Sequence, residues 1–395
     1  MARLLPALIV SLTLAACGAP AATAPTRAPA AIPPSAAPTS AARADEGCKL
    51  SISRAGWQTD FSRCSVGPDE IRSGGPPRDG IPPIDRPKLI SPAEATWLKD
   101  NEPVVAYEER GEARAYPLQI LIWHEIANDE VAGRPIAVTF CPLCNTAIAF
   151  DRRLDGRLLD FGTTGNLRHS DLVMWDRQTE SWWQQITGEA IVGELTGKKL
   201  KPLPASIVSF ADFKSAYPTG AVLSRETGYA RSYGSNPYVG YDDVNSSPFL
   251  FSGQADPRLR PMERVVTVSL NGEDAAYPFA SLEQHRVVQD RVGGRPIVVF
   301  FARGTTSALD GSSIAGSRDV GATGVFDPTV DGRSLTFKAD GDRIADAETG
   351  STWPVLGRAT GGPLAGKRLT PILHADHFWF SWAVFRPQTR VWRPE

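Results

Sequence analysis

Short apolar runs separated by turn residues make up most of the chain. A hairpin is predicted from Pro103 to Tyr107 and from Ala113 to Tyr116, with its turn at Arg110-Gly111, and an apolar strand from Pro135 to Phe140. Short runs bounded in this way are typical of strands. A short helix is predicted from Pro117 to about Ala127, because proline is tolerated in the first turn of a helix. The pattern therefore predicts a mainly β fold with a few short helices, in the α+β class.

Glycine and proline support this prediction. The chain contains 35 glycines and 33 prolines, and this composition favours short strands and turns over long helices. We expect breaks between strands at Asp155-Gly156 and from Gly162 to Gly165. The Gly/Ser-rich stretch inserted after Ala308 is expected to be a surface loop.

One series of residues occurs twice, which indicates an internal duplication. At a constant offset of 161, the segment that starts at Tyr116-Pro117 matches the segment that starts at Tyr277-Pro278. Both then contain a histidine, an aspartate, a Gly-Arg-Pro-Ile motif and a phenylalanine in the same order. Later matches, such as Trp183 with Trp353, continue the series. We therefore predict two tandem, diverged copies of one β-rich module.

The first residues have the pattern of an export signal. A basic start at Arg3 is followed by an apolar run from Leu4 to Leu14, which is too short to span a bilayer, and then by Ala-Ala-Cys17. The position of Cys17 resembles the processing box of bacterial lipoproteins, in which this cysteine becomes lipidated. An ordinary signal peptide with an incidental Cys17 is the alternative. We expect an exported protein, lipid-anchored at Cys17 on the periplasmic or cell-surface face of a bacterial membrane.

These patterns divide the chain into six segments. They are residues 1–16, a signal peptide; 17–46, a lipidated Ala/Pro/Thr-rich tether; 47–100, an N-terminal segment; 101–228, the first module; 229–264, an aromatic-rich connector; and 265–395, the second module. In an oxidising compartment, Cys48 and Cys64 are predicted to form a structural disulfide within the N-terminal segment.

A Cys141-Pro-Leu-Cys144 motif occurs in the first module only, because Ala302 and Thr305 occupy the matching positions of the second. The module therefore folds without these cysteines, which are free to serve a site. Three interpretations stay open: a redox dithiol, a metal site built from thiolates, and a structural disulfide. The residues that begin at Thr146 are predicted to form a strand, so the thiols are expected at a turn between strands.

Comparison of the two modules also ranks the neighbouring candidates. His124 is a candidate ligand or base, but His285 occupies its place in the module without cysteines, which favours a scaffold role. Glu125 aligns with an arginine and is the better candidate for a role specific to the first module. Met174 is a candidate soft-metal ligand, although its replacement by Ile344 equally fits a core position.

Other polar residues complete the candidate set. Thr146 follows the motif directly, and Arg177 and Gln185 are replaced by apolar residues in the second module. They suit a wall that faces a substrate, with simple solvation as the alternative. His374 and His377 belong to the second module and would complete a zinc set with the two cysteines if the modules face each other. Capping of the aromatic strand that follows is the alternative.

Charge and motifs exclude several classes of function. Lys and Arg number 42 against 44 Asp and Glu, so the chain lacks the basic surplus of a nucleic-acid-binding protein. The sequence contains no Walker loop, no G-x-S-x-G and no H-E-x-x-H motif. Asn145 after Cys144 disfavours covalent haem attachment, which needs histidine at that position.

The runs Ala115-Tyr116-Pro117-Leu118, His124-Glu125-Ile126 and Phe140-Cys141-Pro142-Leu143-Cys144 resemble the domain-of-unknown-function family 3179. Segments that begin at Asp171 and Asp176 extend the resemblance, which covers nearly the whole body from Gly56 onward. Some members of that family are described as selenoproteins, with selenocysteine in place of a cysteine of the motif. The resemblance therefore implies redox or metal-ligand work for Cys141 or Cys144.

The leading hypothesis is an exported, lipid-anchored protein in which Cys141 and Cys144 cycle between dithiol and disulfide. An unidentified redox partner or small-molecule substrate would contact the wall near Arg177 and Gln185. One rival is a metal-binding protein that holds copper or zinc, although no cofactor is certain. The other rival is a non-catalytic surface interaction module that uses its tyrosines and tryptophans as contact area.

Overall fold

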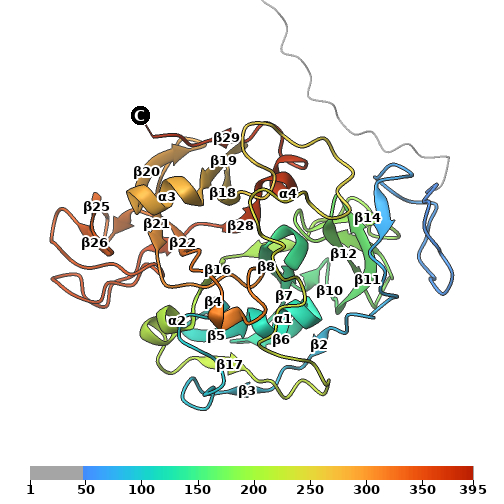
Figure 1. The fold of residues 1–395 in the computed structure, drawn as a ribbon, viewed down its shortest axis with the longest axis horizontal. Helices are drawn as coiled ribbons and strands as arrows, with labels where there is room; N and C mark the ends of the chain where they lie inside the picture. The colour runs from blue at the N-terminus through green and yellow to red at the C-terminus, as the bar shows by residue number, and fades with distance from the viewer. Residues whose placement is uncertain (1–47, 395) are drawn as a thin grey trace, which may run out of the picture. The chain divides into compact units, whose positions relative to one another are not determined.

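The computed structural model describes residues 48–394, in which the strands form five sheets of four or five strands and three two-stranded hairpins (Figure 1). Only short helices accompany them, so the predicted mainly β fold is confirmed. The predicted signal peptide, the lipidation site at Cys17 and the whole tether lie outside the described residues. No helix among residues 48–394 has the length and apolar character that a membrane span needs.

Three sheets belong to the first half of the chain. The first contains, in spatial order, β15 (Lys201–Leu203), β8 (Thr146–Asp151), β7 (Arg134–Cys141), β6 (Ile126–Val131) and β2 (Ile84–Asp85). The second contains β1 (Ile71–Ser73), β11 (Phe161–Arg168), β12 (Asp171–Asp176), β13 (Trp182–Gln184) and β14 (Glu189–Val192). The third contains β16 (Ala205–Ser209), β4 (Pro103–Glu109), β5 (Glu112–Pro117), β17 (Ala221–Leu223) and β3 (Leu89–Ile90).

Two further sheets belong to the second half. They contain β28 (His374–Phe378), β18 (Arg264–Leu270), β19 (Glu273–Pro278) and β29 (Arg390–Val391); and β20 (Val287–Val292), β21 (Arg295–Ala302), β22 (Ala322–Asp327) and β27 (Thr370–Pro371). The hairpins are β9 (Arg153–Leu154) with β10 (Arg157–Leu158), β23 (Thr329–Val330) with β24 (Arg333–Ser334), and β25 (Phe337–Asp340) with β26 (Arg343–Asp346). The helices are α1 (Leu118–His124), α2 (Phe210–Ala216), α3 (Phe279–His285) and α4 (Trp379–Ala383), with 3-10 turns η1 (Pro142–Cys144) and η2 (Ile314–Gly316).

The local elements expected around the cysteine motif are present. Strands β4 and β5 form the predicted hairpin, and its turn residues Arg110 and Gly111 both have positive φ. The predicted apolar strand lies within β7. Helix α1 begins after Pro117 as expected but ends at His124, before the predicted Ala127. It ends there because Glu125 has a left-handed φ of 58°, and the Glu125 carbonyl accepts a hydrogen bond from the amide of Phe140.

Two expectations about irregular segments are wrong. The stretch from Gly162 to Gly165 does not break a strand: it lies inside β11, where the register with β12 shifts as in a β-bulge. Gly165 has a φ of 74°, and a Cβ atom there would lie 1.9 Å from the carbonyl oxygen of Pro76. The insertion after Ala308 is not purely a surface loop, because Leu309 and Ile314 are fully buried.

The predicted Cys48–Cys64 disulfide is present, with a Cα–Cα distance of 5.7 Å. The segment that it closes packs aromatic side chains against β13. The rings of Trp57 and Phe61 lie 5.0 Å and 5.5 Å from the ring of Trp182, both in edge-to-face arrangements. The N-terminal segment is therefore part of the folded body and covers the sheet that contains β12.

Equivalent positions of the two halves make equivalent contacts. The order β4, β5, α1, β6, β7, β8 has the same antiparallel pairings as β18, β19, α3, β20, β21, β22. The Tyr116 hydroxyl donates to Asp129 and the Tyr277 hydroxyl donates to Asp290, each at 2.7 Å. These contacts suit a common plan for the two halves, and the duplication itself stays a prediction from the sequence.

Candidate functional site

The C-P-L-C motif forms a tight turn between two buried strands. Cys141 ends β7, η1 follows, and β8 begins at Thr146, which pairs directly with Cys141. The turn closes because Asn145 adopts a left-handed φ of 52° and its amide donates to the Pro142 carbonyl. The thiols therefore lie at a turn between strands, as the sequence predicts. Both cysteines are free, and their exposed fractions are 1% and 0%.

Asp171 at the start of β12 joins the two thiols. One carboxylate oxygen of Asp171 and the Sγ atoms of Cys141 and Cys144 all lie within 4.8 Å of one another. The Asp171 Oδ2 atom accepts hydrogen bonds from the side-chain amide of Gln184 and from the backbone amide of Ile186. The Oδ1 atom is buried and has no hydrogen-bond partner among the described residues. The two sulfurs and one carboxylate oxygen of Asp171 thus form a group that can hold a metal ion.

Burial controls the protonation of this group. It raises the pKa of Cys141 and raises that of Cys144 further. It also raises the pKa of Asp171 to about 6. The pKa of Glu125 rises to about 8, because the carboxyl is buried and lies near the negative charge of Asp171. Without a bound cation, both thiols and Glu125 therefore hold their protons at neutral pH.

Two residues proposed from the sequence lie beside the turn. The Thr146 hydroxyl donates to the Cys144 carbonyl at 3.1 Å and lies 2.7 Å from Nδ1 of His377. The Gln185 side-chain amide donates to Thr139 Oγ1 at 2.8 Å and to the Thr146 carbonyl at 3.3 Å. Both side chains are buried, so they support the backbone of the turn and are not part of an exposed wall.

His124 and His374 are buried, with both ring nitrogens already engaged. His124 binds the Pro82 carbonyl through Nδ1 at 2.7 Å and the Tyr233 hydroxyl through Nε2 at 2.6 Å. His374 binds the Ile372 carbonyl and Ser206 Oγ. Neither ring belongs to the group of metal-binding atoms around the thiols.

Met174 and Arg177 lie toward the other end of β12 from Asp171. Met174 is fully buried opposite Trp183, in the hydrophobic core. Arg177 follows the strand and forms an ion pair with Asp85 at 2.9 Å, with about a third of its side chain exposed. The structure therefore places Arg177 and Gln185 apart, and they do not form one wall.

The aromatic-rich connector, residues 229–264, packs against the turn. The Tyr241 hydroxyl donates to the Leu143 carbonyl at 3.1 Å, and Tyr238 and Tyr241 pack against the core that contains both cysteines. Ser170, whose carbonyl lies 3.8 Å from Cys141 Sγ, donates its hydroxyl to the Phe249 carbonyl. The connector thus separates the thiols from solvent.

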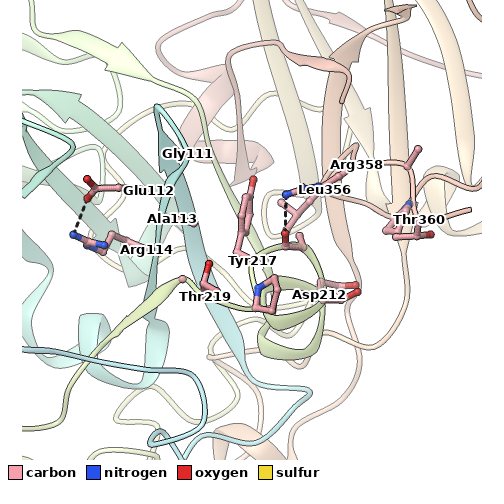
Figure 2. Close-up of a pocket in the computed structure, with 16 residues that line it drawn as sticks. Gly111, Glu112, Ala113, Arg114, Asp212, Tyr217, Thr219, Leu356, Arg358 and Thr360 are labelled. Carbon is pink, nitrogen blue, oxygen red and sulfur yellow. Dashed lines mark hydrogen bonds and ion pairs between the residues drawn. The ribbon is translucent and has the colours of Figure 1, made fainter. Parts of the chain in front are cut away.

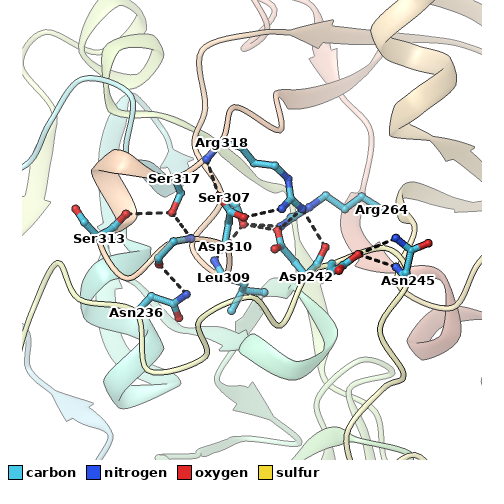
Figure 3. Close-up of polar contacts among 12 residues, drawn as sticks. Asn236, Asp242, Asn245, Arg264, Ser307, Leu309, Asp310, Ser313, Ser317 and Arg318 are labelled. Atoms are coloured by element: carbon cyan, nitrogen blue, oxygen red, sulfur yellow. Dashed lines mark hydrogen bonds and ion pairs between the residues drawn. The ribbon is translucent and has the colours of Figure 1, made fainter.

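A buried charge network fastens this connector to the insertion of the second half (Figure 3). Asp242 of the connector pairs with Arg264 at 2.7 Å and with Arg318 at 2.8 Å, and it accepts a hydrogen bond from Ser307. The Asp242 side chain is completely buried. The backbone amide of Asn236, in the connector, also donates to the Ser312 carbonyl. The insertion and the connector therefore hold each other in place.

Asp171 is the main site residue that reasoning from the sequence missed. The sequence could have identified it, because the alignment that pairs Trp183 with Trp353 also pairs Asp171 with Gly341. An acidic residue found only in the module with cysteines meets the same criterion that singled out Glu125. Gln184, which holds the Asp171 carboxylate, aligns with Pro354 and carries the same signal.

A separate surface pocket of about 590 Å³ lies between the β4–β5 hairpin, the end of α2 and the segment around Arg358 (Figure 2). Its charged groups are mostly paired: Arg114 contacts Glu112, and Arg358 donates to the Ala216 carbonyl. None of the residues around the thiols lines this pocket, so it is not part of the cysteine site.

Comparisons with known proteins point to one family. Residues 78–389 match the family described as "Protein of unknown function (DUF3179)". This range includes the cysteine turn, Asp171 and His377. No curated protein and no solved structure matches the chain.

Proposed function

The chain belongs to the DUF3179 family, and we propose that Cys141, Cys144 and Asp171 bind a metal ion. The observation that carries this proposal is the Oδ1 atom of Asp171. It is a buried oxygen that accepts no N–H or O–H hydrogen bond from the described residues, and the Asp171 carboxylate supplies one of three donor atoms that lie within 4.8 Å of one another. The neighbouring thiols are only weak hydrogen-bond donors to this carboxylate, and a bound cation would satisfy the buried oxygen more strongly.

The three donors favour zinc over copper. Zinc accepts thiolate and carboxylate ligands together, whereas the softer Cu(I) prefers sulfur alone. The backbone amide and the Gln184 side chain that hold Asp171 Oδ2 leave Oδ1 free as a ligand. Three protein ligands leave one position of a tetrahedral ion open, which is the usual arrangement of a zinc ion that takes part in chemistry.

Metal content tests the proposal. The purified protein, loaded with zinc and passed through a desalting column, is expected to retain one zinc per chain by elemental analysis. Cys144→Ser and Asp171→Asn are each expected to lower zinc affinity at least tenfold. Asp129→Asn, which alters a buried carboxylate outside the site, serves as the control and is expected to retain zinc. Zinc retention unchanged by Asp171→Asn would contradict the assignment.

Dithiol–disulfide cycling of Cys141 and Cys144 is the second candidate function. It is favoured by the closeness of the two sulfurs in one C-x-x-C turn. It is disfavoured by burial, because the attacking species in thiol exchange is an accessible thiolate and burial raises both thiol pKa values. A chain that binds no zinc or copper, but whose cysteine pair has a reduction potential above about −300 mV, would support this function.

We also propose that the protein is exported and lipid-anchored at Cys17. The proposal rests on the apolar run before Cys17 and on the Cys48–Cys64 disulfide, because disulfides persist mainly in oxidising compartments. The full chain expressed in a bacterium is expected in the membrane fraction, and Cys17→Ser is expected to release it. A wild-type chain that stays in the soluble cytosolic fraction would refute the proposal.

A further inference from the structure

A small cavity lies beside the cysteine turn. It has a volume of about 130 Å³ and is bounded by β8 and β15 of the first half and by β18, β28 and the α4 region of the second. Its wall is mainly apolar and includes Ile148, Phe150, Ile186 and Trp382. An engineered apolar cavity of about 150 Å³ binds benzene. This cavity therefore has room for one aromatic ring or a short aliphatic chain.

His377 lines the cavity and has one buried ring nitrogen, Nε2, without a hydrogen-bond partner among the described residues. The hydroxyl hydrogen of Thr146 is directed to the Cys144 carbonyl, so Nδ1 of His377 donates to Thr146 Oγ1 at 2.7 Å. This assigns the hydrogen to Nδ1 and leaves a lone pair on Nε2. Nε2 is buried and has no partner among the described residues. The ring is held by stacking on Trp382, with centroids 5.0 Å apart.

The His377 ring stays neutral, because burial lowers its pKa to about 3. Nε2 is therefore an acceptor throughout the physiological pH range. A purely apolar occupant would leave this nitrogen unpaired, which costs free energy. An occupant that brings a hydrogen-bond donor, such as a hydroxyl group, would pair with this nitrogen.

Two cationic side chains line the same cavity. Neither Lys199 nor Arg386 forms an ion pair with any carboxylate in residues 48–394, whereas the adjacent Lys198 pairs with Asp155 at 2.7 Å. Lys199 is exposed and Arg386 is half-buried. Unpaired positive charges beside an apolar cavity attract a ligand that carries a negative group.

We propose that this cavity binds a small hydroxylated aromatic carboxylate. The ring lies against the apolar wall, the hydroxyl donates to Nε2 of His377, and the carboxylate faces Lys199 and Arg386. The site is distinct from the thiol–carboxylate group and does not need a bound metal. Thr146 connects the two, because its hydroxyl contacts both the Cys144 carbonyl and His377.

Calorimetric titration of the metal-free protein with 4-hydroxybenzoate and with benzoate tests the proposal. These probes differ only in the hydroxyl group, which would donate a hydrogen bond to Nε2 of His377. We expect 4-hydroxybenzoate to bind about tenfold more tightly than benzoate. His377→Phe, which keeps an aromatic ring and removes the acceptor, is expected to abolish the difference between the two probes.

The cationic residues provide a second test that does not alter the core. The Lys199→Gln, Arg386→Gln double variant is expected to weaken binding of both probes at least fivefold. Lys198→Gln, at the neighbouring paired lysine, is the matched control and is expected to bind both as the wild type does. Absence of binding, equal affinity of the wild type for the two probes, or unchanged affinity in the double variant would each overturn the proposal.

Discussion

Glu125 and Asp171 are both buried, and the negative charge of Asp171 adds to the effect of burial in raising the pKa of Glu125. Their raised pKa values mean that the folded protein binds protons more tightly than the unfolded chain, in which Asp and Glu have pKa values near 4. Proton uptake therefore stabilises the metal-free fold. In the proposed metal site the same acids, once ionised, would be a ligand and a neighbour of the cation, so protons would compete with the metal.

We predict that the buried Glu125 carboxyl contributes a loss of stability to the metal-free protein as the pH rises from about 4.5 to 8. Below this window both states hold the Glu125 proton; within it, the unfolded state ionises first and folding stability falls by up to about 1.4 kcal/mol per pH unit. Above pH 8, where the folded pKa of Glu125 lies, the loss from this group is complete. Denaturant unfolding at several pH values measures the slope.

Glu125→Gln is expected to reduce that slope, because the amide does not titrate. The control is Glu130→Gln, which alters an exposed glutamate on β6 and is expected to leave the slope unchanged. Equal slopes for the wild type and Glu125→Gln would show that Glu125 ionises normally in the fold.

His124 and His285 show why a shared residue type does not guarantee a shared role. Both end the equivalent helices α1 and α3. His124 is buried and connects Pro82 to Tyr233, whereas His285 is exposed and binds the Ser281 carbonyl of its own helix. The scaffold role expected for His124 fits its contacts, but those contacts reach segments outside the repeated pattern.

At the scale of elements, the two halves differ most where the cysteines lie. In the first half β7 and β8 are joined by the short turn η1; in the second, β21 and β22 are joined by the long insertion between Ala302 and Ala322. That insertion places Leu309 and Ile314 in the same core cluster as Cys141 and Cys144. The segment that replaces the cysteine turn in one half therefore helps to enclose it in the other.

We predict that Asp242→Ala loosens this enclosure. The change leaves Arg264 buried without its counter-charge, and removing one partner of a buried ion pair costs about 3–5 kcal/mol. Because Asp242 holds the connector to the insertion, the cysteines should react faster with iodoacetamide, as measured by mass spectrometry under conditions where the variant stays folded.

Asp310→Ala is the matched control for this prediction. Asp310 also pairs with Arg318, but at a more exposed position, so its removal should cost less than about 1 kcal/mol and leave the labelling rate nearly unchanged. Equal labelling rates for Asp242→Ala and the wild type would mean that the connector does not limit access to the thiols.

At the scale of the whole folded body, residues distant in sequence meet at one place. Asp171 follows Cys141 after several intervening strands, and His377 contacts Thr146 across 231 residues of sequence. The proposed metal site thus belongs to the first half, while the neighbouring cavity has walls from both halves. The first half alone would contain the thiols but lack His377 and the insertion that encloses them.

The sequence by itself determined the features that depend on neighbouring residues. Turn residues, short apolar runs and a proline before α1 indicated the mainly β fold, the hairpin, and the turn that holds Cys141 and Cys144. The Cys48–Cys64 pairing was also accessible, because the two cysteines are close in sequence and both lie in the N-terminal segment, away from the C-P-L-C motif.

Only the tertiary structure decided which side chains share the interior with the thiols. Asp171 and His377 reach the turn because strands from different sheets pack together, and desolvation there sets their protonation. Arg177 fulfils the same sequence criterion as Gln185, yet it follows the far end of β12. Burial and proximity arise from long-range packing, which the local pattern of the chain does not encode.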